Sequence, residues 1–169
     1  MLAFLHSNAA YNAIKAGTAE LARPLLAEAV PLAKELGDAL VLAFVRGNAG
    51  LEALFTDDLD RAQNAFDDHL QLCGAHGFNW LASEGLADLA AIAARRGDLQ
   101  RAARLLGAAT TAGSWDGDAD VTELLEAQFF APARTGYGEE RWTEGRATGA
   151  QLSFEKSIDL ALGSAARRS

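Results

Sequence analysis

The chain repeats itself at an offset of 40 residues, and this period limits the folds open to it more than any other feature. The offset superposes residues 2–4 (Leu-Ala-Phe) on residues 42–44, which have the same sequence. A second step of 40 places residues 97–99 (Gly-Asp-Leu) on residues 57–59 (Asp-Asp-Leu). Two full units and most of a third are present. Because one unit of this size is too small to bury its own apolar face, the units are expected to stack on one another.

Each unit is predicted to form two helices, because its apolar residues recur at intervals of three and four. In the second unit the first helix is expected over residues 39–55 and the second from residue 59 to a stop at residues 74–77. Residues 56–58 supply the stop and N-cap chemistry between them, and Gly97 and Asp98 repeat it. Alanine occurs 37 times, against seven Val and Ile together, which excludes a β-rich fold.

Small residues stand at the positions where paired helices would cross. They are Ala10, Gly50 and Ala90 in the first helices and Ala22, Ala62 and Ala102 in the second. This order resembles the tetratricopeptide repeat. The predicted fold is therefore all-α, a tetratricopeptide-like helical-repeat solenoid of 40-residue helix pairs over residues 1–113 with a C-terminal helical cap over residues 114–169. Pro31 is expected to bend or interrupt its helix, because it lacks an amide donor.

The cap is predicted from capping and stop residues after Gly113. A polar loop over residues 114–120 should end in an N-cap, and a helix over residues 121–130 should be closed by Pro132. Residues 138–142 open another helix, and Ser153 opens a last one that extends through Leu162.

Two runs, residues 97–109 (GDLQRAARLLGAA) and residues 138–162, carry a closer resemblance. They resemble the C-terminal helical-repeat region of bacterial LuxR-type, MalT-like and cyclase-linked signal-transducing ATPase regulators. The resemblance implies a sensing and partner-binding role, without the family's ATPase or DNA-reading activity, because neither motif occurs here. Since Met1 falls near the first helix with no capping residue before it, we expect the chain to be a fragment or a truncated descendant of a longer regulator.

Charge and composition exclude several classes of function. The formal charge of −8 argues against direct nucleic-acid binding, which needs clustered Lys and Arg. No apolar run is long enough to cross a membrane and no signal peptide is recognisable, so a membrane role is not expected. A single cysteine, Cys73, fits a cytoplasmic location. No phosphate loop, nucleophile elbow or convergent catalytic group occurs, so we predict neither an enzyme nor a cofactor.

Two residue groups have metal-ligand character. His69, Cys73 and His76 share a helix face and could hold zinc, but the repeat places them at core positions, so packing is the favoured interpretation. Asp116, Asp118 and Asp120 match the first half of a calcium loop, but the required glycine and bidentate glutamate are missing, which favours a capping loop.

The partner-binding face is expected along the first helices. Its predicted residues are Tyr11, Lys15, Asn48, Leu51, Phe55 and Arg95. The alternative is that the apolar members only pack against a neighbouring unit. A clamp for a peptide's terminal carboxylate is not expected, because Glu84 and Asp88 bring the wrong charge.

Two further groups are interpreted structurally. The basic group of Arg95, Arg96, Arg101 and Arg104 is assigned to solvated helix ends, with docking of an acidic partner as the alternative. Arg167 and Arg168 form a second basic group at the end of the chain. Trp80, Trp115 and Trp142 are assigned to core or cap packing.

These observations predict a non-catalytic protein-interaction or sensor module of a bacterial transcriptional or signalling regulator, whose partner is a protein, a peptide or another domain of the parent regulator. The alternative function is a small-molecule receptor with a pocket between the repeats and the cap, near the tryptophans. An uncapped N-terminal end would also allow a homodimer through the first helix, with Phe4 and Tyr11 at the contact.

Overall fold

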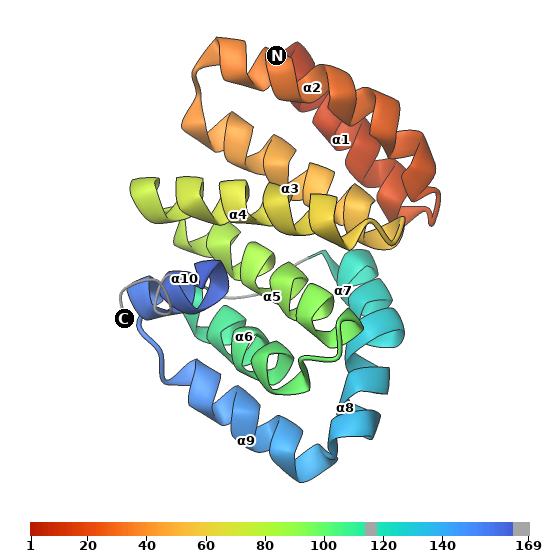
Figure 1. Ribbon diagram of the computed structural model, residues 1–169. Helices are drawn as coiled ribbons and strands as arrows, with labels where there is room; N and C mark the ends of the chain where they lie inside the picture. Colours follow the sequence, from red (N-terminus) through yellow and green to blue (C-terminus); the bar gives the residue numbers. More distant parts are fainter. Residues whose placement is uncertain (114–117, 164–169) are drawn as a thin grey trace. The chain divides into compact units, whose positions relative to one another are not determined.

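The computed structural model of the protein describes residues 1–113 and 118–163, and every regular element in these ranges is helical (Figure 1). The all-α prediction is therefore confirmed for the described part of the chain. Contacts divide the chain into two compact units, unit 1 over Met1–His76 and unit 2 over Gly77–Ser169. The predicted boundary between repeats and cap, at Gly113, falls inside unit 2 and stays a prediction about where the repeat ends.

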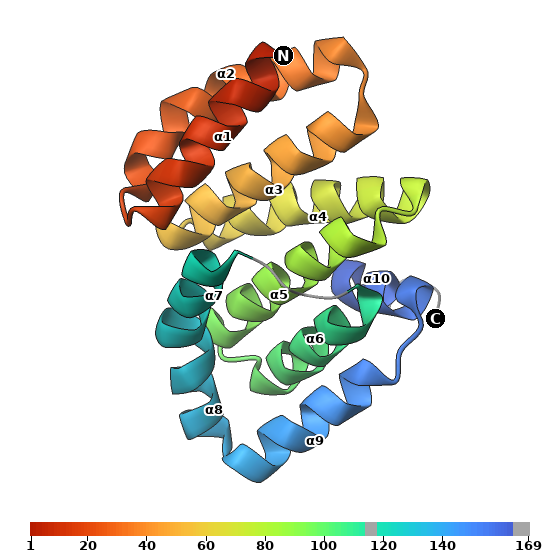
Figure 2. The same ribbon diagram turned by 180° about the vertical axis from the view of Figure 1, so that it is seen from behind.

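Unit 1 consists of two helical hairpins. Its elements are α1 (Leu2–Lys15), a short 3₁₀ turn (Ala19–Leu21), α2 (Ala22–Leu36), α3 (Ala39–Phe55) and α4 (Leu59–His76). Helix α1 packs against α2 and α3 against α4, while α1 and α2 both contact α3 (Figures 1 and 2). The first hairpin joins α3 through a buried cluster of small and β-branched residues, Ala3, Ala29, Ala33 and Val45. The predicted helix over residues 39–55 is confirmed without a shift of either end.

The junctions between helices repeat in backbone conformation. Positive φ angles occur at Gly17, Gly37, Asp57, Gly77 and Gly97, which stand 20 residues apart. After α1, α3 and α5 the same hydrogen bond closes the helix: a backbone amide donates to the carbonyl of an alanine five residues earlier. The pairs are Thr18 to Ala13, Asp58 to Ala53 and Asp98 to Ala93, at 2.9, 2.8 and 2.9 Å. The 40-residue period of the sequence is thus a period of the local backbone.

The crossing points predicted from small residues are buried in both units. Ala10, Ala22, Ala62, Ala90 and Ala102 are each 0% exposed. At Gly50, a Cβ atom would approach the ring of Phe66 on α4 to 2.6 Å, so α3 and α4 can pack at this distance only because the residue has no side chain.

Pro31 does not interrupt its helix, so of the two effects expected of it, bending or interruption, the second does not occur. Helix α2 is continuous from Ala22 to Leu36 with Pro31 inside it. Pro31 is exposed, as is Ala27, whose carbonyl loses its intrahelical donor. Water can hydrogen-bond that carbonyl, so the helix is weakened at this point without ending.

Unit 2 contains one long hairpin and a set of shorter helices. Its elements are α5 (Asn79–Arg95), α6 (Leu99–Ala112), α7 (Ala119–Leu125), a π-helical turn (Glu126–Phe130), α8 (Ala131–Tyr137), α9 (Glu139–Ala150) and α10 (Phe154–Leu162). Helix α6 is covered on one side by α5 and on another by α9, and α10 contacts both α5 and α6 (Figures 1 and 2). The Ser153 hydroxyl accepts from the Lys156 amide at 3.3 Å, which confirms the predicted start of the last helix.

Pro132 does not close a helix, so the prediction that it ends the helix over residues 121–130 is wrong. The chain continues from α7 through the π-helical turn into α8, which ends at Tyr137. The hydrogen-bond register changes at the π-helical turn, and Pro132 falls in the first turn of α8, where a missing amide donor is tolerated. Phe129 and Phe130 of the π-helical turn are buried.

Glycines bring α6 and α9 into backbone contact. A Cβ atom on Gly149 would overlap the carbonyl oxygen of Arg104, and one on Gly107 would overlap that of Arg146. A Cβ on Gly145 would lie 2.7 Å from the Cβ of Ala103. Helix α9 of the predicted cap is therefore fixed to α6 at three points that admit no side chain.

Candidate functional site: a groove between α2 and α4

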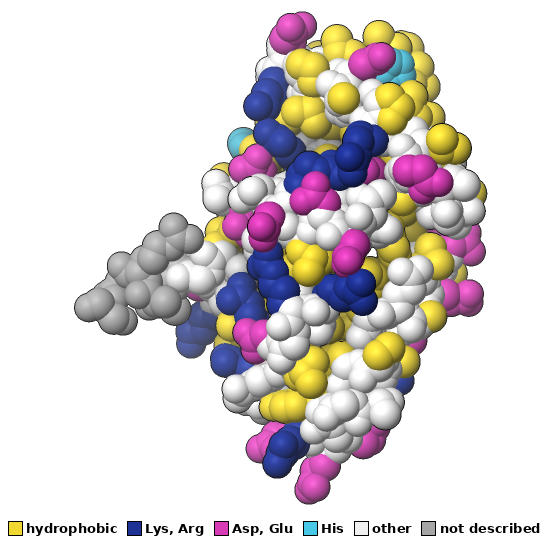
Figure 3. Space-filling model, turned by 45° about the vertical axis from the view of Figure 1, so that its right-hand side comes forward, with side chains coloured by type: hydrophobic (Ala, Val, Ile, Leu, Met, Phe, Trp, Pro, Cys, Tyr) yellow, Lys and Arg dark blue, Asp and Glu magenta, His cyan; other side chains and the backbone are white. Residues whose placement is uncertain are grey.

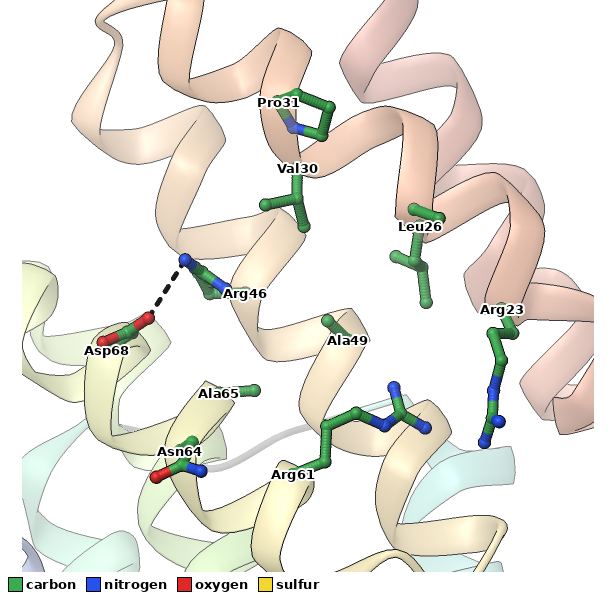
Figure 4. Close-up of a pocket in the computed structure, with 11 residues that line it drawn as sticks. Arg23, Leu26, Val30, Pro31, Arg46, Ala49, Arg61, Asn64, Ala65 and Asp68 are labelled. Atoms are coloured by element: carbon green, nitrogen blue, oxygen red, sulfur yellow. Dashed lines mark ion pairs between the residues drawn. The ribbon is translucent and has the colours of Figure 1, made fainter.

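A cavity of about 440 Å³ opens on unit 1, with α2 and α4 as its walls and α3 as its floor (Figure 4). We call it the α2–α4 groove. Its lining residues are Arg23, Leu26, Ala27, Val30, Pro31, Arg46, Ala49, Arg61, Asn64, Ala65 and Asp68. The middle of the groove is apolar, and guanidinium groups stand towards its two ends (Figure 4).

The sequence spacing explains why these residues share one groove. On α2 the lining residues lie between positions 23 and 31, and on α4 between 61 and 68, in steps of three or four that place them on one face of each helix. Eight residues of helix correspond to about 12 Å of length. Each of the three helices contributes one alanine to the lining: Ala27 from α2, Ala49 from α3 and Ala65 from α4. Their small side chains leave the volume between the helices unfilled.

Glu52 holds one end of the groove together. Its side chain is 0% exposed, on α3 behind the lining residues. The Nε of Arg23 donates to Oε1 at 3.0 Å, and the Nη1 of Arg61 lies 2.5 Å from Oε2. Because the two arginines come from α2 and α4, one carboxylate ties three helices together. A buried carboxylate without such partners would be strongly destabilising.

Arg61 is the most heavily used of the cations. Its Nε donates to Asp58 Oδ2 at 3.0 Å, and this bond lowers the pKa of Asp58. The hydrogen bond to Glu52 raises the pKa of Arg61, so the guanidinium is permanently charged. Its Nη2 is buried and has no hydrogen-bond partner in the described part of the chain. One donor of this arginine is therefore left without an acceptor among the described residues.

Arg46 marks the other end, where its Nη2 pairs with Asp68 Oδ2 at 3.1 Å (Figure 4). The Asp68 side chain is 49% exposed, and a pair of this kind contributes at most about 1 kcal/mol. A ligand carboxylate could replace Asp68 at little cost. Figure 3 shows Lys and Arg side chains gathered around hydrophobic ones on the face turned forward. The groove is thus suited to an apolar segment that carries acidic groups.

The residues predicted for partner binding lie elsewhere, and none of them lines the α2–α4 groove. Tyr11, Lys15 and Phe55 are half-buried in unit 1, and Leu51 is buried. Arg95 is exposed at the end of α5 in unit 2. A binding face along the first helices stays a prediction.

Asn48 has a structural partner. Its Nδ2 donates to the Ser7 hydroxyl at 2.7 Å and to the Ser7 carbonyl at 3.2 Å. Since Ser7 belongs to α1 and is 1% exposed, this side chain fixes α1 against α3. The amide donors of Asn48 are therefore already used inside unit 1.

The packing interpretation of the zinc-like group is confirmed for two of its residues. His69 and Cys73 are buried, with His69 Nδ1 2.8 Å from the Ala43 carbonyl oxygen and Cys73 Sγ 3.7 Å from His69 Nε2. His76 is exposed, so its predicted core position is wrong, because it ends α4 where the helix leaves the core. Within the described ranges no three potential ligands form a metal-binding group.

The calcium-like loop is described only in part. The side chain of Asp118 accepts from the Asp120 amide at 3.0 Å, which confirms its capping role. Asp116 and Trp115 lie outside the described residues, as do Arg167 and Arg168.

The basic group around α5 and α6 divides into two kinds of residue. Arg95 and Arg96 are exposed at the end of α5, which agrees with the solvated interpretation. Arg101 differs, because its Nη2 donates to the Ala161 carbonyl at 2.7 Å and so joins α6 to α10.

The tryptophans also divide. Trp142 is 1% exposed and packs with its ring centroid 6.4 Å from that of Phe130, as predicted. Trp80 is 50% exposed in the first turn of α5, so its predicted burial is wrong.

The predicted N-terminal contact surface is partly exposed. Leu2, Phe4 and Leu5 are 53%, 42% and 54% exposed, and Phe4 meets Phe44 edge to face at 6.1 Å. A homodimer through this end stays a prediction.

Sequence reasoning did not identify the groove residues Arg23, Arg46 and Arg61, or the buried Glu52. One signal was present, since Glu52 is the only charged residue in an otherwise apolar run over residues 49–55 (Ala-Gly-Leu-Glu-Ala-Leu-Phe). A carboxylate at a core position predicts nearby cations. Which arginines supply them depends on the packing of α2 and α4, which the sequence pattern does not contain.

A scan against models of known protein families, a search of curated proteins and a search of solved structures each find no match. Among the helices of the described residues, none combines the length and the apolar character needed to span a bilayer.

Proposed function

We propose that this chain is a non-catalytic interaction module that binds a short acidic segment of a partner protein in the α2–α4 groove. The observation that supports this proposal is the arrangement of Arg23 and Arg61 at one end of an apolar cavity and Arg46 at the other. Guanidinium groups form bidentate hydrogen bonds with carboxylates, and the apolar centre would bury the side chains between them.

Charge favours an acidic ligand at this place and not over the whole surface. The chain has a formal charge of −8, whereas three arginines and one carboxylate, Asp68, line the groove. Glu52 and Asp58 offset part of the charge of Arg23 and Arg61. This leaves Arg46, paired with the exposed Asp68, as the cation that an acidic ligand can pair with most readily. Most of the protein surface would repel an acidic partner, and the α2–α4 groove would attract it. The partner would therefore bind at the groove and not elsewhere on the surface.

The length of the groove limits what it can hold. About 12 Å accommodates three or four residues of extended peptide. The ligand that fits has an acidic residue at the Arg23 and Arg61 end, two apolar residues over Leu26, Val30 and Ala65, and a second acidic residue at Arg46.

The architecture we propose around this groove is a tetratricopeptide-like stack of 40-residue helix pairs with a helical cap. The recurring backbone junctions after α1, α3 and α5 support it, as does the contact of α9 with α6. The resemblance to the repeat region of LuxR-type and MalT-like regulators supports a role for the module in sensing or in contacts within a signalling regulator.

The test is a fluorescence-anisotropy titration of the full chain with a labelled peptide that contains Glu-Leu-Leu-Asp. A matched peptide with Gln-Leu-Leu-Asn is the control. We expect saturable binding of the acidic peptide, weakened by salt, and much weaker binding of the control.

Variants locate the binding. Arg46→Gln should weaken it, because Arg46 pairs only with the exposed Asp68 among described residues. Ala27→Trp should fill the groove from its exposed wall and abolish binding. Lys34→Gln, an exposed residue of α2 outside the groove, is the matched control. Equal binding of the two peptides, or full binding by Ala27→Trp, would refute the proposal.

A further inference from the structure

A second cavity, of about 340 Å³, lies inside unit 2 between α6, α8 and α9. We call it the α6–α9 cavity. Its lining residues are Gly107, Thr110, Arg134, Glu139, Trp142, Thr143, Arg146, Ala147 and Ala150. It is separate from the α2–α4 groove, which belongs entirely to unit 1.

The indole of Trp142 has an unused donor. The residue is 1% exposed, and its buried Nε1 has no hydrogen-bond partner within the described residues. A buried tryptophan usually finds an acceptor for this group, and leaving it unpaired is unfavourable. Because Trp142 also lines the cavity, an acceptor from a bound molecule would satisfy it.

Two arginines line the cavity, and they differ in their partners. Arg134 is held by carboxylates, with its Nη2 2.6 Å from Glu126 Oε1 and its Nε 3.5 Å from Glu139 Oε2. Arg146 is half-buried on α9 and, among the described residues, takes part in no ion pair or hydrogen bond. One cation of the cavity is therefore uncompensated, which favours a ligand with a single negative charge.

The remaining lining residues set the size and polarity of that ligand. Gly107, Ala147 and Ala150 give small apolar walls, and Thr110 and Thr143 contribute hydroxyls. The Thr110 hydroxyl donates to the Gly107 carbonyl at 2.6 Å and keeps its lone pairs as acceptors. The backbone contacts of Gly107 and Gly149 fix α9 on α6, so the cavity is preformed and little conformational entropy is lost on binding.

We propose that the α6–α9 cavity binds a small organic monocarboxylate with an apolar body. One oxygen of the carboxylate accepts from the guanidinium of Arg146 and the other from Trp142 Nε1, and the body rests on Ala147 and Ala150. This makes the chain a small-molecule receptor as well as a peptide-binding module. The inference does not rest on the proposed function, because no residue is shared by the two sites.

The test uses the indole ¹H–¹⁵N signals of the three tryptophans in the full chain, titrated with sodium benzoate. The signal of Trp142 is assigned by its loss in Trp142→Phe. We expect this signal to move saturably as Nε1 gains an acceptor. Arg146→Gln should raise the dissociation constant about ten-fold or more, as expected for the loss of one charge-assisted hydrogen bond.

Two controls separate this site from unspecific effects. Arg141→Gln changes an exposed arginine of the same helix that does not line the cavity, and it should bind benzoate as the wild type does. Benzamide, which has the same ring without the charge, should bind much more weakly. Circular dichroism of Arg146→Gln checks that the fold is retained.

Three results would overturn the proposal: an unmoved Trp142 signal at saturating benzoate, equal binding of benzamide, or undiminished binding by Arg146→Gln. Binding of the acidic peptide to the α2–α4 groove is measured separately and would be unaffected by any of them.

Discussion

Each unit buries a carboxylate on the first helix of a hairpin, and the two units stabilise it in opposite ways. In unit 1, Glu52 on α3 is 0% exposed and meets the guanidinium groups of Arg23 and Arg61. In unit 2, Asp88 on α5 is 6% exposed, and burial, with the charge of Glu84 nearby, raises its pKa well above the ordinary value. One carboxylate is paired with cations, whereas burial favours the neutral form of the other.

The two units also differ in how their helices pack. Unit 1 spaces α2 and α4 so that arginines and alanines leave a groove between them. Unit 2 brings α6 and α9 into backbone contact through glycines. Ionic pairing therefore accompanies the α2–α4 groove, and close backbone packing accompanies the α6–α9 cavity.

The largest effect is expected where close packing leaves no room. Gly149→Ala should destabilise unit 2 by about 3 kcal/mol or more, because its Cβ would overlap the carbonyl oxygen of Arg104. Urea unfolding followed by tryptophan emission reports this unit, since Trp80, Trp115 and Trp142 all belong to it. Gly136→Ala is the matched control, because its Cβ would meet no atom within 4 Å. Equal unfolding midpoints for the two variants would contradict the close-packing account.

The ionic arrangement of unit 1 comes next. Glu52→Ala should destabilise this unit by about 2–3 kcal/mol. This value is below the usual cost of breaking a buried ion pair, because the side chains of Arg23 and Arg61 are 56% and 39% exposed and can be solvated by water once Glu52 is removed. Hydrogen exchange measured on peptides from α2, α3 and α4 should show faster exchange.

Glu28→Ala is the control for Glu52→Ala. Its side chain is 69% exposed beside His6, and its loss should change stability by less than about 0.5 kcal/mol. Unchanged exchange in the Glu52 variant would mean that the three helices hold together without their shared carboxylate.

A smaller, stabilising effect is expected at the exposed proline of α2. Pro31→Ala should restore an intrahelical hydrogen bond to the Ala27 carbonyl and raise the free energy of unfolding by about 1–2 kcal/mol. This net value allows for the greater conformational entropy of the unfolded chain without the proline. Pro24→Ala, in the first turn of the same helix, should have little effect. Thermal unfolding by circular dichroism compares them, and a lower midpoint for Pro31→Ala would show that the proline stabilises the groove wall.

The smallest effect concerns the neutral carboxylate of unit 2. Because the native pKa of Asp88 is raised, the native state keeps a proton that the unfolded state has lost. Stability should therefore fall as pH rises from the ordinary carboxyl pKa of about 4 through the native pKa, and stay lower above it. Asp88→Asn should remove this loss and stabilise unit 2 by about 1 kcal/mol at alkaline pH.

The pH dependence of stability is tested by measuring the unfolding free energies of wild type and Asp88→Asn, followed by tryptophan emission, from about pH 4, the ordinary carboxyl pKa, to about pH 9. The two curves should converge at the acidic end. Parallel curves across the range would mean that Asp88 is ionised in the native state and has a partner.

The comparison also shows how far sequence reasoning extends. Helix ends were predictable where a capping side chain acts locally, as Ser153 does at the start of α10, with its hydroxyl accepting from the amide of Lys156. The effect of Pro132 was misjudged because it depends on the π-helical turn that precedes it, and the continuity of α2 through Pro31 depends on solvent exposure at that point. The groove depends on residues 29 to 38 positions apart, Arg23 with Glu52 and Arg61, which meet only in the folded unit.

The residues with positive φ angles bear on how the gene that encodes this chain could change in length. They are Gly17, Gly37, Asp57, Gly77 and Gly97. Because they recur every 20 residues, each helix-and-turn segment begins and ends in the same backbone conformation. Duplication or loss of one segment would reverse the direction of every helix that follows. Duplication or loss of a pair would preserve direction and need no new turn, so in-frame recombination in steps of 40 codons is the change that this architecture tolerates best.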